Sequence, residues 1–133
     1  MSYFKTLEEA QEFFRADRFA TDNGMVLDEI GEDWAKASVT LAEVHRNAQG
    51  DIMGGAIFTL GDLAFAAACN NVHFPSVAQQ VSINLMSATH GSKLFAYAKC
   101  IKDGRSSGVY TVMITDDLGK DIALYTAVAF KKQ

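Results

Sequence analysis

The sequence predicts an α+β fold in which an antiparallel sheet wraps around one long buried helix, with a shorter helix preceding both. Residues 56–70 are apolar on nearly every side, which is typical of a helix surrounded by protein. Residues 34–41 alternate between apolar and polar side chains, as a half-buried strand does. Beyond the helix, segments rich in β-branched and aromatic residues follow one another across short turns, which favours antiparallel pairing.

The elements can be assigned in order along the chain. Thr6–Ala16 is predicted to be a short helix, because Thr6 and Glu9 have the spacing of a capping box. Strands at 25–30 and 34–41 surround a turn and should form a hairpin, and the loop 45–55 then leads to the long helix. The remaining strands are expected at residues 81–85, 93–101, 108–115 and 122–131.

The outer surface of the predicted sheet favours an oligomer. Met86, Val112 and Ile114 are expected on the face turned away from the helix, where they would be exposed in a monomer. A sheet around a single helix also leaves strand edges that need protection. We therefore expect a homodimer or homotetramer.

Composition places narrow limits on the protein class. The 133 residues, 49% of them hydrophobic, fit one domain spanning 1–133. The net charge is −4 and no basic run occurs, so nucleic acid is not an expected partner. No apolar run reaches the length of a membrane span and the N-terminus lacks a signal-like apolar segment, which predicts a cytoplasmic protein. The histidines and cysteines show no ligand spacing, so neither a metal site nor a cofactor is predicted.

Asp62 is the strongest candidate for a catalytic residue. It lies in the middle of the apolar helix, and no Lys, Arg, Glu or second Asp occurs between Asp51 and His73. An aspartate on a solvated helix face is the ordinary alternative. That alternative is weakened here because no other charged residue accompanies Asp62, and an unpaired buried carboxylate is costly.

Three residues before Asp62 could complete a site. Gly54 and Gly55 precede the predicted helix, and a glycine pair lets a backbone approach a ligand closely. Free N–H groups at a helix start can polarise a carbonyl. Asn47, in the same loop, offers a polar side chain, although asparagine is also an ordinary turn residue.

Residues 45–66, which contain these candidates, resemble the core motif of the hotdog-fold thioesterases, specifically the PaaI-like subgroup of phenylacetate degradation. Residues 104–110 and 123–125 resemble later segments of the same subgroup. The resemblance implies a hotdog fold and hydrolysis of an acyl-CoA thioester by a dimer whose sites are shared between subunits.

The resemblance also implies roles for individual residues. Asp62 matches the family's catalytic carboxylate, and Gly54, with Gly55 beside it, matches the amide that binds the thioester carbonyl. Asn47 matches a polar residue near the attacking water or the carboxylate. Met53 and Phe58 are candidates to contact the acyl group. Arg105 and Ser106 match a turn that contacts CoA, and Lys93, Lys102 and His90 are further candidates for the CoA phosphates.

Two departures from the family keep other functions open. Met53 stands where the family usually has histidine, and residues 63–68 carry no hydroxyl to assist the carboxylate. A non-catalytic protein that binds or senses acyl-CoA is therefore an alternative. A hydroxyacyl-thioester dehydratase is a weaker one, because it needs a histidine base and His45 is the sole candidate nearby.

Overall fold

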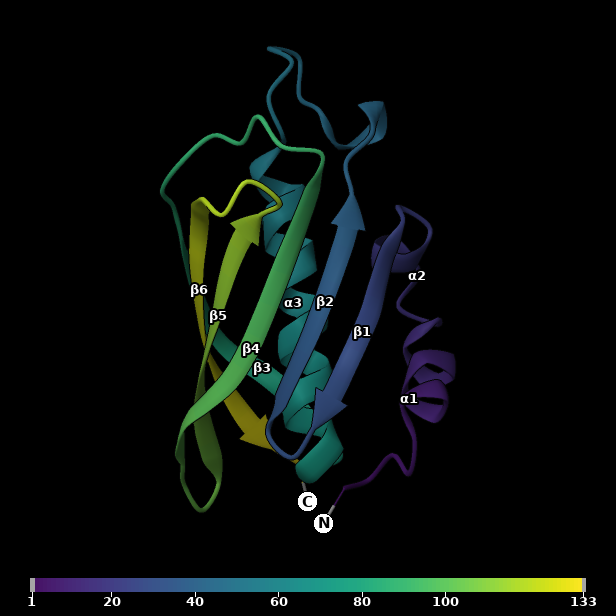
Figure 1. Ribbon diagram of the computed structural model, residues 1–133. Helices are drawn as coiled ribbons and strands as arrows, with labels where there is room; N and C mark the ends of the chain where they lie inside the picture. The colour runs from purple at the N-terminus through teal and green to yellow at the C-terminus, as the bar shows by residue number, and fades with distance from the viewer. Residues whose placement is uncertain (1, 133) are drawn as a thin grey trace.

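The computed structural model describes residues 2–132, which form one six-stranded antiparallel sheet curved around a central helix (Figure 1). The strands are β1 (Met25–Gly31), β2 (Trp34–Thr40), β3 (Ser76–Leu85), β4 (Lys93–Asp103), β5 (Ser107–Asp116) and β6 (Asp121–Lys131). Their order in the sheet is β1-β2-β4-β5-β6-β3. The expected antiparallel sheet is confirmed, with β1 and β3 as its two edges.

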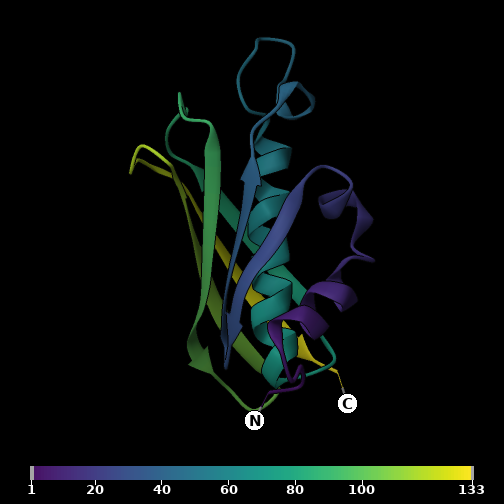
Figure 2. The same ribbon diagram turned by 45° about the vertical axis from the view of Figure 1, so that its right-hand side comes forward.

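The central helix, α3 (Gly54–Val72), lies in the hollow of the curved sheet (Figure 2). Its side chains pack on every strand, and Leu60, Ala64 and Ala67 have no exposed surface. At about 1.5 Å per residue, its 19 residues span about 28 Å. Within residues 2–132, no helix has both the length and the hydropathy needed to cross a bilayer.

Two short helices cover the edge of the sheet beside β1. The first, α1 (Leu7–Phe14), is shorter than predicted, and the Thr6 hydroxyl accepts a hydrogen bond from the Glu9 amide at 3.1 Å, which confirms the N-cap. The second, α2 (Arg18–Thr21), was not predicted, because four residues are too few to show a helical period. A 3₁₀ turn, η1 (Glu43–His45), follows β2.

The predicted boundaries of the central helix were wrong at both ends. The helix begins at Gly54 and ends at Val72, so Gly54 and Gly55 form its first turn instead of preceding it. At the other end, the Asn71 side chain accepts a hydrogen bond from the Phe4 amide at 3.0 Å and donates one to the Gly31 carbonyl at 2.8 Å. These bonds satisfy the buried side chain of Asn71 near the end of an otherwise apolar helix.

The predicted outer-face positions on β5 were also wrong. Val112 and Ile114 have no exposed surface and face α3, whereas Met113, between them, points outward. Both faces of β5 carry apolar side chains, so alternation could not decide which face is buried. Met86 is exposed, but it lies just beyond the end of β3.

Candidate active site

Asp62 lies on the side of α3 that is not fully enclosed by the sheet, and its side chain is half-buried. The Tyr125 hydroxyl on β6 donates a hydrogen bond to Asp62 Oδ1 at 2.8 Å. The Tyr125 side chain itself has no exposed surface. Burial, then the charge of Asp62 and the hydrogen bond to it, raises the pKa of the Tyr125 hydroxyl, so the hydroxyl stays protonated and remains a donor.

Asp62 lines a hollow of about 650 Å³ between α2 and α3. Asp17, the residue before α2, lines the same hollow, and burial followed by the charge of Asp62 raises the pKa of the Asp17 carboxyl. Apart from these carboxylates and Arg18, the walls are apolar or small: Phe19, Ala20, Gly55, Phe58, Thr59 and Leu63. The hollow can therefore hold an apolar group next to a carboxylate.

The start of α3 offers free backbone donors. Within residues 2–132, no hydrogen bond is formed by the amides of Gly54 or Gly55, as expected for the first turn of a helix. A Cβ added at Gly54 would lie 2.8 Å from Leu85 Cδ1, whereas one at Gly55 would meet nothing closer than 3.8 Å. The Leu85 side chain therefore lies close to Gly54, whereas there is space beside Gly55.

Gly54 and Asp62 are not adjacent within one chain. They lie eight positions apart in α3, which corresponds to about 12 Å along the helix axis. The length of a thioester carbonyl group is far less than this distance. One chain therefore does not bring the Gly54 amide and the Asp62 carboxylate to the same carbonyl.

Asn47 stabilises a turn in the loop before α3. Its Oδ1 accepts hydrogen bonds from the amides of Gln49 and Asp51 at 3.0 and 3.1 Å. The loop that contains it projects beyond the start of α3 (Figure 1). Asn47 thus lies at the Gly54 end of the molecule, and no contact joins it to Asp62 among the described residues.

His45 is a structural residue. It is 4% exposed, its Nδ1 accepts a hydrogen bond from the Ala42 amide, and its Nε2 donates one to the Asn23 carbonyl. Both ring nitrogens are therefore engaged, and neither is free to accept a substrate proton. Met53, the N-cap of α3, is half exposed and lines a small hollow of about 140 Å³ beside His45 and Gly55.

Arg105 and Ser106 lie in the turn between β4 and β5, at the end of the sheet opposite Gly54 (Figure 1). Lys102 lies on β4 next to this turn. His90 and Lys93, by contrast, lie at the end of the sheet that is near the start of α3. A single chain does not gather the predicted CoA-binding residues around Asp62.

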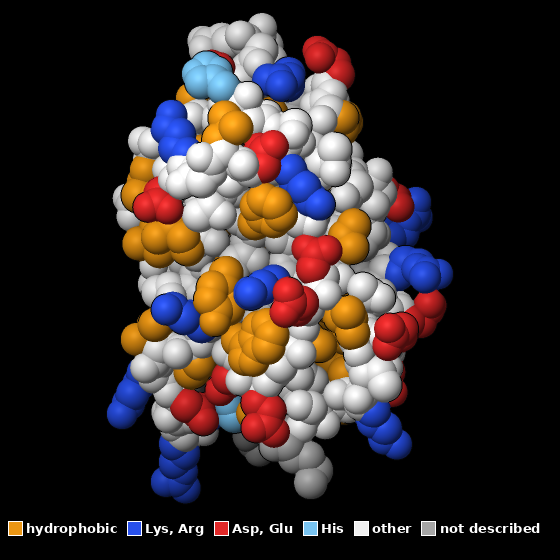
Figure 3. All heavy atoms as spheres, in the orientation of Figure 1, with side chains coloured by type: hydrophobic (Ala, Val, Ile, Leu, Met, Phe, Trp, Pro, Cys, Tyr) orange, Lys and Arg blue, Asp and Glu red, His pale blue; other side chains and the backbone are white. Residues whose placement is uncertain are grey.

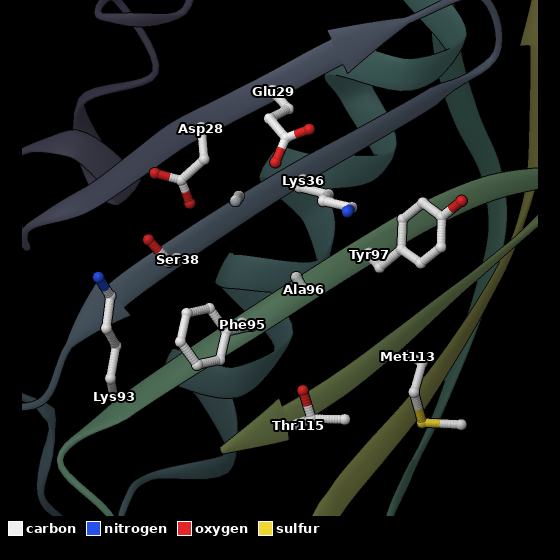
Figure 4. Close-up of a pocket in the computed structure, with 11 residues that line it drawn as sticks. Asp28, Glu29, Lys36, Ser38, Lys93, Phe95, Ala96, Tyr97, Met113 and Thr115 are labelled. Atoms are coloured by element: carbon white, nitrogen blue, oxygen red, sulfur yellow. The ribbon is translucent and has the colours of Figure 1, made fainter. Parts of the chain in front are cut away.

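A separate groove of about 530 Å³ crosses the outer face of the sheet (Figure 4). Phe95 and Tyr97 of β4 form its floor, and the Lys36 ammonium lies 5.2 Å from the Tyr97 ring. This face carries acidic, basic and apolar side chains in mixture, without a basic stripe (Figure 3). The sheet separates the groove from α3, the helix that carries Asp62.

Comparison with known proteins identifies the family. The sequence model of the thioesterase superfamily matches residues 49–123, which is more than half of the chain and includes both Gly54 and Asp62. The chain belongs to the thioesterase superfamily. The thioesterase is also 30% identical over 122 residues to the acyl-coenzyme A thioesterase PaaI of Escherichia coli K12, covering 91% of this chain and 87% of that one.

Solved structures agree with the sequence comparison. The thioesterase matches the PaaI protein of the E. coli phenylacetic acid degradation operon with a TM-score of 0.87 and 26% identity, over 93% of this chain and 91% of that one. A Streptococcus pneumoniae thioesterase solved with coenzyme A matches with a TM-score of 0.81 over 90% and 96% of the two chains, and its 22% identity supports the fold alone. The predicted PaaI-like hotdog fold is confirmed.

Two features of the thioesterase's site were not predicted from sequence. Tyr125 carried a usable signal, because a tyrosine on the buried face of a strand needs a partner for its hydroxyl. Asp17 gave no signal, since it lies in a polar stretch between two short helices.

Elsewhere, the fold brings ligand atoms of Asp33, His73 and Asp103 within 4.8 Å of one another. The Asp103 carboxylate in this cluster is already paired with the Lys131 ammonium at 2.5 Å.

Proposed function

We propose that this thioesterase hydrolyses an acyl-CoA thioester to a free acid and CoA, with Asp62 as the catalytic carboxylate. One observation carries the proposal: a half-buried carboxylate, held by one donor, faces a hollow with mostly apolar walls. The name of the E. coli relative supports CoA as the thiol of the substrate. The S. pneumoniae structure shows that a protein of this fold can hold coenzyme A.

The chemistry requires little beyond a carboxylate and a polarised carbonyl. In one route, Asp62 takes a proton from water while the resulting hydroxide adds to the carbonyl carbon. In the other, Asp62 Oδ2 attacks the carbonyl itself, and water then hydrolyses the mixed anhydride. In both routes the Gly54 amide stabilises the oxyanion, the C–S bond breaks, and the CoA thiolate leaves and is protonated.

We infer that each site is shared by two copies of the chain. The 12 Å along α3 between Gly54 and Asp62 prevents one chain from supplying both groups to one carbonyl. In a twofold dimer, Asp62 of one copy meets Gly54 of the other, and the second site is completed reciprocally. Asn47 of the second copy would then orient water or the carboxylate, because it lies at the same end as Gly54.

The hollow beside Asp62 suits the acyl group. Phe58 and Phe19 supply its aromatic surface, and the neighbouring small hollow at Met53 extends it. The CoA phosphates need cations and hydrogen-bond donors. We propose Arg105 and Lys102 with the Ser106 hydroxyl from one copy, or His90 and Lys93 at the other end of the sheet. Aromatic and aliphatic acyl groups both fit these walls.

A non-catalytic acyl-CoA binding protein is the second candidate. Met53 in place of the family's histidine and the absence of a hydroxyl at residues 63–68 favour it. A dehydratase is disfavoured, since the two ring nitrogens of His45 are both hydrogen-bonded to backbone groups.

The substitution Asp62→Asn distinguishes these functions. Asparagine keeps the oxygen that accepts from Tyr125 and removes the charge, so the Tm should hold or rise. Hydrolysis, measured against a panel of acyl-CoAs, should fall by about 10²–10⁴ while acyl-CoA binding persists. Normal turnover in the folded variant would remove Asp62 from the mechanism. Tight binding without turnover in the unaltered protein would establish the non-catalytic function.

A further inference from the structure

Tyr125 is held in one position against Asp62. Its ring packs between the aromatic rings of Phe58 and Phe65, with centroid distances of 5.4 and 6.1 Å. Gly61, directly before Asp62, lets the ring approach α3, because a Cβ there would lie 3.0 Å from Tyr125 Cδ2. The ring therefore has little freedom to move.

We propose that Tyr125 is the positioning residue of Asp62, fixing Oδ1 so that Oδ2 faces the thioester. This inference rests on the proposed function. The Tyr125 side chain has no exposed surface, so it acts through the carboxylate and does not touch substrate. Tyr125 thus supplies from β6 the hydroxyl that holds the carboxylate, which residues 63–68 of α3 cannot supply because they carry no hydroxyl.

Within residues 2–132, Tyr125 donates the one hydrogen bond that Asp62 receives. The ionisable groups whose charge interacts with Asp62 are Asp17 before α2, Tyr125 on β6 and Cys69 on α3, while Arg18 lines the same hollow. Burial and then the charge of Asp62 raise the pKa of the Asp17 carboxyl, and burial holds the pKa of the Cys69 thiol at about 12, so it stays neutral. Among the described residues neither group donates a hydrogen bond to Asp62, so Tyr125 is the donor that holds the carboxylate in place.

Loss of the hydroxyl removes the contact that fixes Asp62. The carboxylate becomes free to rotate about its side-chain bonds, which lowers the fraction of complexes aligned for reaction. We therefore expect a lower kcat with little change in KM.

The test is Tyr125→Phe, with Tyr110→Phe as a matched control. Tyr110 is 1% exposed on the neighbouring strand, packs on the same Phe65 ring at 5.4 Å, and donates its hydroxyl to Asp33. Both variants remove one buried hydroxyl bonded to an aspartate, and both keep the ring that fills the space. Tyr125→Phe should lower kcat about tenfold with little change in KM, the effect of losing a hydrogen bond to a charged group, whereas Tyr110→Phe should leave both kcat and KM unchanged.

A double-mutant cycle with Asp62→Asn separates positioning from a general loss of structure. If Tyr125 acts through the carboxylate, Tyr125→Phe should cost little further turnover once Asp62 is asparagine. An equal loss in both backgrounds, or an equal loss in Tyr110→Phe, would overturn the inference. An inactive Asp62→Asn beside a fully active Tyr125→Phe would refute positioning alone, whereas an active Asp62→Asn would refute the proposed function itself.

Discussion

Asp17 and Asp62 face the same hollow from different elements, one before α2 and the other on α3. Burial is the first cause of the raised pKa of the Asp17 carboxyl, and the charge of Asp62 is the second. The pKa of the Asp17 carboxyl therefore reports the charge of the carboxylate that we assign to catalysis.

Removing the charge of Asp62 should therefore lower the pKa of the Asp17 carboxyl. In Asp62→Asn, the Asp17 carboxyl, followed by NMR, should titrate at lower pH than in the wild type, because only burial then raises its pKa. Asp22→Asn is the control: it removes the same charge from the other end of α2, where Asp22 pairs with Arg18 at 2.7 Å. An unchanged Asp17 titration in Asp62→Asn, or the same shift in both variants, would refute the coupling.

Gly54→Ala should reduce turnover far more than Gly55→Ala. An added Cβ at Gly54 lies 2.8 Å from Leu85 Cδ1, so the methyl group and the displaced Leu85 side chain should crowd the space where the carbonyl approaches the Gly54 amide. Alanine keeps that amide, and a carbonyl displaced from it should cost up to about 10²-fold in kcat, the effect of losing one such donor. Gly55→Ala is the matched control, because its Cβ meets nothing closer than 3.8 Å. Alanine favours a helix over glycine, so both variants should keep their Tm. Equal activities would place the oxyanion donor elsewhere.

A site shared between two copies predicts recovery of activity from two inactive variants. Asp62→Asn and Gly54→Ala, each weak alone, should regain activity when their subunits are exchanged, because each mixed dimer pairs an intact Asp62 with an intact Gly54. Random exchange at equal amounts should restore about a quarter of the wild-type rate. Light scattering should show no stable monomer. A mixture whose activity is only the average of the activities of the two variants would indicate a site within one chain.

The sequence predicted the central helix and Asp62 because their signals are local. Fifteen nearly uninterrupted apolar residues are typical of a buried helix, and one charge among them is conspicuous. The capping residue Thr6 was equally local, since cap and amide lie three positions apart. The start of α3 was misplaced, because a glycine pair is compatible with both a loop and a first helical turn.

Longer-range relationships could not be predicted. Tyr125 contacts Asp62 only because β6 lies beside α3. The strand order that places β6 there cannot be predicted from the alternation of apolar and polar residues within any one strand. The inward direction of Val112 depends likewise on the register between β5 and β4. A strand that is apolar on both faces gives no indication of that register.

Asp116 should make the molecule's stability depend on pH in acid. It is 3% exposed; the Thr89 hydroxyl donates to its Oδ2 at 2.6 Å, and the Lys120 and Leu118 amides donate to its Oδ1 at 2.9 and 3.0 Å. The Thr89 bond, followed by the amide bonds, lowers the pKa of the Asp116 carboxyl below its usual 3.8. The unfolded chain thus takes up this proton first as pH falls. The stabilisation is present above the unfolded value and is lost as pH falls through the folded one.

The variant Asp116→Asn cannot titrate, so its Tm should fall by fewer degrees than the wild-type Tm between about pH 6 and about pH 3. Part of the dependence should remain, because hydrogen bonds also lower the pKa values of Asp103 and Asp117. Thr89→Val keeps the carboxyl and removes its hydroxyl donor, and should give an intermediate slope. Thermal melts at several pH values would reveal these slopes, and a wild-type slope in Asp116→Asn would show that this carboxyl does not control acid stability. Because Thr89 and Asp116 join the segment after β3 to the turn before β6, the Tm of Asp116→Asn near neutral pH should itself be lower than wild type.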